Sequence, residues 1–304
     1  MDKIAAMRAF VAVVEHDGFA AAARALGLSR SVVNRQVIQL EDTVKTQLLV
    51  RNTRKVSPTQ AGLAYYDRCV RILADIEDAE LELDRQTDAP RGLLRVNAPM
   101  SFGTMHLAGK VGDFCKRYPE VSVQLQLDDR FIDPIAEGYD VTIRVAALQD
   151  SALIARRIAT ARMALVASPD FLKEYGPLVS PDDLARVPCL HQGAVAAGSQ
   201  WTLEGPDGTR AIPVRGRFGS NNGEATAEVA ARGLGVAMLP TFIACPFLRE
   251  GRLVPVLEGW EPAPVGIHAI YAPNRHMAPK VRSFIDFLVE AFGGTPYWDR
   301  RSSS

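Results

Sequence analysis

The stretch FAAAARALGLSRSVVNR, residues 19–35, decides the fold of the N-terminal part of this chain. An alanine-rich helical segment runs into a Gly27-Leu28-Ser29 turn, and a second helical segment follows it. Gly27 suits a left-handed C-terminal cap, and Ser29 is a favourable N-cap for the second segment. The polar and basic residues on one side of that segment are Arg30, Ser31, Asn34 and Arg35. This layout predicts a helix-turn-helix, whose second helix enters the major groove of DNA.

The flanking sequence predicts one further helix before this pair and a β-wing after it. Apolar residues that recur at steps of three and four mark the first helix: Ile4, Met7, Val11 and Val14. On the third helix, the residues expected to face inward are Val33, Val37 and Leu40. Segments 48–51 and 55–57 are expected to form two short strands joined by a basic tip. Such a wing would lay three cations along a phosphate backbone: Arg51, Arg54 and Lys55.

The charge of the chain is neutral overall but uneven. Among its 304 residues, 35 are basic (Lys and Arg) and 35 are acidic. Between residues 24 and 55, however, seven basic residues stand against two acidic ones, an excess of seven minus two, or +5. A local excess of this kind suggests a face built for phosphates. Without the helix-turn-helix, a solvated basic surface would explain it equally well.

Pro58 is expected to open a long helix, and residues 59–88 are assigned to this linker helix. An apolar seam steps along it by 4, 3, 4, 3 and 4 residues through Tyr65, Cys69, Ile72, Ile76, Ala79 and Leu83. That spacing is typical of a short coiled coil. We expect the helix to pair with a second copy, because helix-turn-helix proteins usually act as symmetric dimers. The alternative is an amphipathic helix packed on its own domain.

The sequence after the hinge-like TDAPRG at 87–92 alternates between strand and helix patterns, which indicates an α/β domain with a largely parallel sheet. A first series of elements runs from residue 93 to residue 145, and a second from 163 to 256. A final strand at 267–271 and a helix at 279–292 could return to the first series. The expected divisions are a winged helix-turn-helix at 1–58, a linker helix at 59–88, an effector domain at 89–296 (lobe I 92–161 and 267–296, lobe II 162–266) and a disordered tail at 297–304.

With these pieces in place, the chain resembles the LysR-type transcriptional regulators of bacteria. The resemblance rests mainly on FAAAARALGLSRSVVNRQVIQLE followed by LLVRNTRKVSPTQAG. Three weaker signatures follow in order: LLRVNAPMSFG, IAEGYDVTIRVAAL and GLGVAMLP. The resemblance implies an α plus α/β architecture: a winged helix-turn-helix, a dimerising linker helix and a two-lobed domain like a type 2 periplasmic binding protein. It also implies promoter DNA and a small-molecule effector as ligands, and a homodimer that assembles into a homotetramer, with RNA polymerase as a further partner.

Several positions depart from the family's usual pattern. Ala20 stands where Thr or Ser is common, Arg30 replaces a common Gln, and Asn34 replaces a common Ser. Lys45 occupies a position where Gly often ends the third helix. These departures make the recognised DNA sequence hard to infer from relatives.

The chemistry of the third helix assigns different roles to its polar residues. Arg can bond bidentately to guanine and Asn to adenine, each worth roughly 1–3 kcal/mol of discrimination. We therefore expect Arg30 and Asn34 to read bases, and Ser31 and Arg35 to contact phosphates or base edges. The wing cations should bind only the DNA backbone: Arg51, Arg54 and Lys55. For each residue, the alternative is a solvated surface side chain.

Candidate effector contacts come from both lobes. Ser101 follows a strand and opens a helix, so its hydroxyl and the free backbone N–H groups there favour a polar or anionic ligand group. The resemblance places this segment in the effector cleft and carries that role to Ser101, Phe102 and Thr104. Further candidates are Asp128 (with Asp129 beside it), His191, Asn221, Asn222 and Thr226. The alternatives are that Ser101 is a plain N-cap, that Asp128 and Asp129 are simply loop acids, and that His191 is a structural histidine.

Two further expectations concern charge at this cleft. An acid such as Asp128 would discourage a carboxylate on the effector and favour hydroxyl or amine groups. Arg144 belongs, with Asp140, to the family's DxxIR pattern, and we interpret it first as a structural residue at the cleft edge.

The remaining patterns argue against other classes of protein. The chain lacks GxSxG, P-loop, HExxH and zinc-like Cys/His spacings, so we expect no catalytic residue, metal or cofactor. Four scattered cysteines fit reduced thiols, and no apolar run approaches the roughly 18 residues of a membrane span, so a cytoplasmic protein is expected. The alternative function is a small-molecule binding protein or enzyme with a helical N-terminal appendage.

Overall fold

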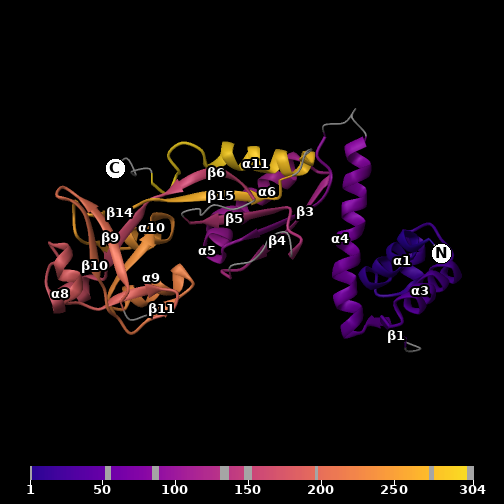
Figure 1. The fold of residues 1–304 in the computed structure, drawn as a ribbon, viewed down its shortest axis with the longest axis horizontal. Coiled ribbons are helices and arrows are strands. Elements are labelled where there is room, and N and C mark those ends of the chain that lie inside the picture. Colours follow the sequence, from indigo (N-terminus) through magenta and orange to yellow (C-terminus); the bar gives the residue numbers. More distant parts are fainter. Residues whose placement is uncertain are drawn as a thin grey trace. The chain divides into compact units, whose positions relative to one another are not determined.

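A computed structural model of the chain describes residues 2–51, 56–83, 89–130, 137–146, 153–195, 198–273 and 277–299. It divides into two compact units, residues 1–88 and residues 89–304 (Figure 1). Arg54 and Lys55 of the expected wing lie outside the described residues, as do residues 84–88 and 300–304. For Arg51, Asp75 and residues 77–83 only the backbone is described.

The first unit contains the three predicted helices and a two-stranded wing. Its elements are α1 (Lys3–Glu15), α2 (Phe19–Ala25), α3 (Arg30–Val44), β1 (Leu49–Arg51), β2 (Val56–Pro58) and α4 (Gln60–Leu83). Strands β1 and β2 pair antiparallel. Val33, Val37 and Leu40 are fully buried on α3 and pack in one core with Phe10 of α1. The inward face predicted from the helical spacing is therefore confirmed.

The turn between α2 and α3 has the caps that its sequence predicts. Gly27 has a φ of +64°, and the Leu28 N–H donates to the carbonyl of Ala23 at 2.9 Å. The Gly27 N–H donates to the Arg24 carbonyl at 3.3 Å, so both bonds of a Schellman motif are present. The Ser29 hydroxyl accepts from the Val32 N–H at 3.3 Å and caps α3. These local bonds set the angle at which α3 leaves the turn.

Lys45 ends α3 in the left-handed conformation, with a φ of 52°. We expect Lys45→Gly to stabilise the first unit by about 0.5–1 kcal/mol, because the left-handed penalty for an L-residue exceeds the extra unfolded-state entropy of glycine. Differential scanning calorimetry of the full chain measures the change. Asp17, also at a φ of 52°, is the matched control, and Asp17→Gly should gain less because Asp tolerates this conformation. Equal gains at the two sites would contradict the explanation.

The start of α4 differs from the sequence expectation. Pro58 ends β2, and the Thr59 hydroxyl accepts from the Gly62 N–H at 2.9 Å, so Thr59 caps the helix. The predicted seam also divides. Cys69 is fully buried in the core of the first unit, and the ring centroid of Tyr65 lies 6.1 Å from that of Phe10. Ile72 is 40% exposed. The N-terminal part of the seam thus packs on its own domain, because α1 lies against it.

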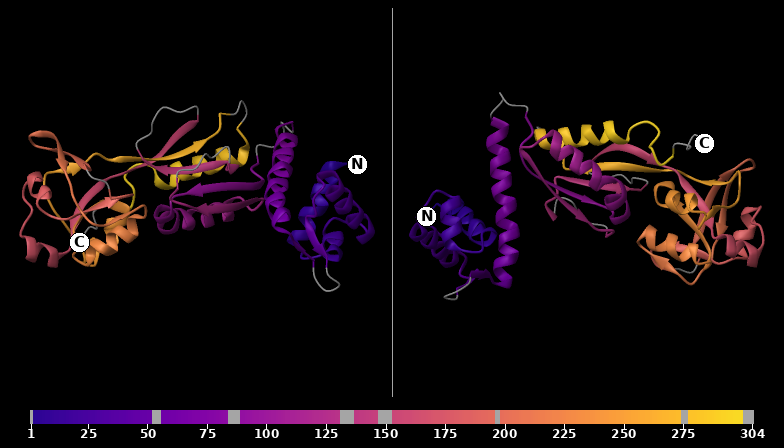
Figure 2. Two further views of the ribbon diagram at one scale, coloured as in Figure 1. Left: turned by 60° about the horizontal axis from the view of Figure 1, so that its bottom comes forward. Right: turned by 180° about the vertical axis from the view of Figure 1, so that it is seen from behind.

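Lobe I of the second unit is built on a five-stranded sheet in the order β4-β3-β5-β15-β6. Its strands are β3 (Gly92–Ala98), β4 (Val121–Leu127), β5 (Val141–Val145), β6 (Ile154–Ala161) and β15 (Val265–Tyr271). A helical run comprises α5 (Met100–Phe102), a π-helical stretch (Gly103–Leu107) and α6 (Ala108–Arg117). The chain returns in α11 (Pro279–Phe292), the yellow helix that lies against β6 (Figure 2). Phe114 of α6 contacts Phe284 and Phe287 of α11.

Lobe II has a second five-stranded sheet, in the order β11-β8-β12-β7-β13, and a three-stranded sheet, β10-β9-β14. The strands are β7 (Met163–Ala167), β8 (Cys189–Gln192), β9 (Gln200–Gly205), β10 (Gly208–Pro213), β11 (Gly219–Ser220), β12 (Val236–Pro240), β13 (Val254–Pro255) and β14 (Glu261–Pro262). The helices are α8 (Pro169–Tyr175), a 3-10 turn (Pro181–Ala185), α9 (Gly223–Ala231) and α10 (Thr241–Arg249).

The expectation of a largely parallel sheet is wrong for some of the strand pairs. In lobe I, β3 pairs parallel with β4 and β5, whereas β15 pairs antiparallel with β5 and β6. In lobe II, β8 pairs parallel with β11 and β12, whereas β12 pairs antiparallel with β7. Both five-stranded sheets are therefore mixed, because the strand that crosses from one lobe to the other enters its new sheet in the opposite direction.

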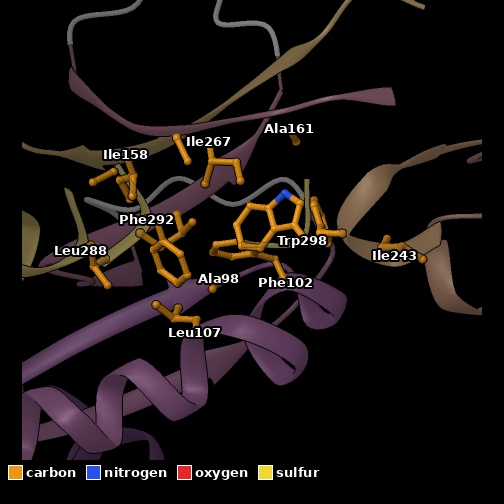
Figure 3. Packing of buried hydrophobic residues seen from close by; sticks show 14 of the residues in the cluster. Ala98, Phe102, Leu107, Ile158, Ala161, Ile243, Ile267, Leu288, Phe292 and Trp298 are labelled. Atoms are coloured by element: carbon orange, nitrogen blue, oxygen red, sulfur yellow. The ribbon is translucent and has the colours of Figure 1, made fainter. Parts of the chain in front are cut away.

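The chain after α11 is ordered further than predicted. Trp298 is only 5% exposed and packs among Phe102, Phe292 and Ile243 in the main core (Figure 3). Its indole lies 4.7 Å from the ring of His106, between centroids. The expected disordered tail from 297 onward is thus wrong for residues 297–299, because a large aromatic side chain fills the core there.

Candidate functional site

The outward face of α3 presents the residues proposed to read DNA. Arg30, Ser31 and Arg35 are exposed, and Asn34 is half-buried. The hydroxyl groups of Ser31 and Ser29 lie 2.9 Å apart, within hydrogen-bonding distance. Ile38, which the sequence pattern does not single out, is 39% exposed on the same stripe, one turn beyond Asn34. Its apolar nature concealed it, because apolar residues on a helix are first assigned to the core.

The wing is fixed to the end of α3 by one carboxylate. Glu41 Oε1 accepts hydrogen bonds from the backbone N–H groups of Leu48 and Leu49, at 2.9 and 3.0 Å. Leu48 and Leu49 are both buried in the core of the first unit. Arg51 lies on β1, which places its backbone in the wing. The orientation of the wing relative to α3 therefore depends on Glu41.

We expect Glu41→Ala to destabilise the first unit by about 2 kcal/mol, because two backbone donors lose a charged acceptor. Glu41→Gln should lose less than half as much stability as Glu41→Ala, since an amide oxygen can accept from both N–H groups. Thermal unfolding of the full chain by calorimetry measures both variants. Equal losses for Ala and Gln would contradict the role of this oxygen as an acceptor.

The second unit contains a cavity of about 240 Å³ between its two lobes. Five of the predicted effector residues line it: Ser101, Phe102, Asp128, Asn221 and Thr226. Further lining residues supply charge, an amide and apolar surface: Asp129, Arg130, Arg144, Gln192, Met163, Met238 and Phe242. The cavity lining thus contains both polar and apolar side chains, which suits a small molecule with both kinds of surface.

Ser101 reaches the cavity because β3 ends at Ala98 and α5 begins two residues later. Asp129 Oδ1 accepts from the Met100 N–H at 2.8 Å and takes the first donor of this helical run. Ser101 makes no cap hydrogen bond, and its buried hydroxyl instead accepts from Asn222 Nδ2 at 3.3 Å. The alternative of a plain Ser N-cap is therefore wrong.

Three of the proposed effector residues do not line the cavity: Thr104, His191 and Asn222. Thr104 is exposed on the π-helical stretch and lies outside the cavity lining. His191 is 4% exposed on β8, while Gln192, the next residue, lines the cavity. Successive side chains of a strand point to opposite faces, so only one of these two can face the cleft. The structural alternative for the histidine fits its position.

The charges at the cavity are balanced rather than acidic. Asp128 accepts from the Arg130 backbone N–H at 2.8 Å and from its Nε at 2.6 Å, and these two bonds lower the pKa of the Asp128 carboxyl. Arg144 donates from Nη1 to Asn97 Oδ1 at 3.4 Å, and burial lowers the pKa of its guanidinium. Two acids and two arginines therefore line the cavity, so the expected bias against a carboxylate effector loses its basis.

Asn222 stands next to the cavity and joins the lobes. Its side-chain oxygen caps α9 by accepting from the Ala225 N–H at 2.9 Å. Its Nδ2 donates to Ser101 Oγ at 3.3 Å and to Asp129 Oδ2 at 3.2 Å. Thr226, one turn further, is 4% exposed and donates to the Asn222 carbonyl at 3.1 Å.

The described residues contain no group of three or more His, Cys, Asp or Glu residues arranged to hold a metal ion. Among the helices that the structure describes, none has the length and hydropathy needed to cross a bilayer.

Both units match families of known proteins. Residues 4–63 match the model of the bacterial regulatory helix-turn-helix proteins of the lysR family, and residues 87–293 match the LysR substrate binding domain. The transcriptional activator AaeR of Escherichia coli K12 is 34% identical, over 96% of this chain and 94% of that protein. The regulator PtxR of Pseudomonas aeruginosa is also 34% identical, over 95% of this chain and 93% of that protein.

Solved structures agree with these sequence matches. CrgA, a LysR-type regulator of Neisseria meningitidis, aligns with a TM-score of 0.60 and 31% identity, over 95% of this chain and 99% of that one. The Vibrio cholerae virulence activator AphB aligns with a TM-score of 0.58 and 28% identity, over 94% and 98% of the two chains.

A winged helix-turn-helix followed by a two-lobed substrate-binding domain defines a ligand-responsive transcriptional regulator. This chain belongs to the LysR family of bacterial regulators.

Proposed function

We infer that the outward face of α3 reads a promoter sequence while the wing holds the DNA backbone. The observation that carries this proposal is the exposed polar stripe on α3, opposite three fully buried residues of the same helix. Arg30 and Asn34 are the proposed base readers, and Ser31 and Arg35 contact base edges or phosphates. Arg51, Arg54 and Lys55 act as backbone contacts, which position the protein without selecting a sequence.

The cavity between the lobes is the proposed effector site. The residues proposed to contact the effector are Ser101, Phe102, Asp128, Arg144, Gln192, Asn221 and Thr226. Hydroxyl, amide and guanidinium groups line the cavity together with apolar side chains, so the effector is expected to carry both polar and apolar groups. The effector acts as a ligand rather than as a substrate, and the protein is cytoplasmic and not an enzyme.

The proposed assembly begins with a homodimer through α4. Ile72 is 40% exposed and Ile76 is half-buried on this helix, so apolar surface remains beyond the part that packs on α1. Two such dimers form the proposed homotetramer, with RNA polymerase as a further partner on the promoter.

Selection from genomic DNA tests the DNA-binding function. The full chain is incubated with sheared DNA of its own source organism at about 0.15 M salt, a concentration at which non-specific binding is weakened. Recovered fragments are sequenced, and enrichment of discrete sites over random competitor is expected. Uniform recovery of DNA would contradict the DNA-binding function.

Thermal unfolding across a metabolite panel tests the effector-binding function. A ligand that binds the folded state raises the unfolding temperature without being converted.

A further inference from the structure

Three polar side chains form a bridge across the cleft of the second unit. Asn222 belongs to lobe II, while Ser101 and Asp129 belong to lobe I. Asn222 Nδ2 donates hydrogen bonds to both of them: it lies 3.3 Å from Ser101 Oγ and 3.2 Å from Asp129 Oδ2. A single amide group thus joins the two lobes at the edge of the effector cavity.

Each member of this bridge is held in place by its own lobe. The Asn222 oxygen is engaged by the first turn of α9, so its amide plane is fixed. The other carboxylate oxygen of Asp129 is engaged by the Met100 N–H at the start of α5. Ser101 is 5% exposed. The three groups therefore meet in a preorganised arrangement, and no side chain has to reorient before the bonds form.

The hydrogen-bond capacity of Asn222 is used within the protein. An Asn side chain offers two N–H donors and one oxygen acceptor. The nitrogen has two acceptors in lobe I, and the oxygen caps α9. Asn222 is also absent from the cavity lining, although its neighbours Asn221 and Gly223 are part of it. These contacts oppose the sequence expectation that Asn222 binds the effector directly.

We propose that Asn222 is a latch between the lobes: it holds the effector cleft closed by donating to Ser101 and Asp129, and it does not contact the effector. This inference rests on the proposed function of the cavity as an effector site. Ser101 is the point of coupling, because it lines the cavity and receives the latch at the same time. An effector group that donates to the Ser101 hydroxyl therefore competes with the latch, whereas a group that accepts the Ser101 proton leaves the bond from Asn222 in place.

The variant Asn222→Asp separates the latch from the helix cap. Aspartate is as good an N-cap as asparagine, so the bond from the Ala225 N–H is retained. It has no N–H to donate, however, and it places a second carboxylate against Asp129, which repels it. We expect the lobes to separate in this variant while α9 stays capped.

A reversed pair supplies the rescue. In the double variant Asn222→Asp with Asp129→Asn, the new amide at 129 can donate to the new carboxylate at 222. Its oxygen can still accept from the Met100 N–H, and the Ser101 hydroxyl can donate to the carboxylate. The double variant should therefore close again. The matched control is Asn221→Ala, which alters the neighbouring lining residue but leaves the latch intact.

The distance between the lobes is measured by pulsed electron paramagnetic resonance on the full chain, without DNA or effector. Spin labels are attached to the native Cys115 on α6 of lobe I and Cys245 on α10 of lobe II, which are both half-buried. Cys69 and Cys189 are buried, and burial raises the pKa of their thiols to about 11 and about 12, so they react slowly. Dilution with unlabelled protein removes distances between chains.

The proposal predicts one narrow distance distribution for the native chain and for Asn221→Ala. Asn222→Asp should shift at least half of the population to longer distances, and the double variant should restore the native distribution. An unchanged distribution in Asn222→Asp would overturn the latch, as would a double variant that stays open. Because neither DNA nor effector is present, failure of the latch is distinguishable from failure of the proposed regulatory function, which the genomic selection tests separately.

Discussion

Trp298→Ala should destabilise the second unit by about 3–5 kcal/mol, the usual cost of removing a buried indole. The indole lies between aromatic residues of both lobes, with ring-centroid distances of 6.2 Å to Phe102, 5.8 Å to Phe292 and 5.9 Å to Phe242. Little of the lost contact can be recovered, because these neighbours belong to three different helices. Urea-induced unfolding of the full chain, with the transition of the second unit followed separately, measures the loss.

Tyr297→Phe is the matched control for this prediction. Tyr297 is 46% exposed, and its hydroxyl is hydrogen-bonded to His106 Nδ1. Removing that hydroxyl should cost only about 1 kcal/mol. Because Phe102 and Phe242 also line the effector cavity, Trp298→Ala should in addition weaken effector binding. A loss below about 1 kcal/mol for Trp298→Ala would show that the C-terminal segment is not part of the core.

Arg30→Ala should reduce the preference for a selected site over random DNA by roughly 10- to 100-fold, the value of one bidentate base contact. Its affinity for random DNA should change much less. Arg54→Ala should instead weaken binding to all sequences alike and lower the salt slope by about one unit. Titrations of both variants against a genomic site and a random duplex, each at several salt concentrations, separate the two roles. If Arg30→Ala behaved like Arg54→Ala, its role as a base reader would be wrong.

The elements of the first unit could be predicted because local bonds determine them. Gly27 takes the positive φ that ends α2, and Ser29 caps α3 within three residues of itself. The helical spacing of Val33, Val37 and Leu40 was enough to locate the core face. The start of α4 was misplaced because Thr59 and Pro58 both favour a helix N-terminus, and only the bond to the Gly62 N–H distinguishes them.

The cleft was harder to predict because its residues meet over long sequence separations. Ser101 and Thr226 could be proposed, since each lies where a strand leads into a helix. His191 and Gln192 could not be distinguished without the direction of each side chain on β8. Arg130 pairs with Asp128 two residues away, yet only the structure shows that both face the cavity. The hydrogen bond from Asn222 to Asp129 joins residues 93 positions apart, and no local sequence pattern predicts it.

The central claim is that α3 provides sequence recognition, and one ratio tests it most directly. This ratio divides the dissociation constant for a random duplex by that for a recovered genomic site of equal length, at about 0.15 M salt. For the native chain a ratio of roughly 10³ or more is expected. Arg30→Ala combined with Asn34→Ala should bring it down toward 1, and a cooperative unfolding transition in calorimetry checks that the double variant is folded. A folded double variant that keeps the native ratio would contradict the account.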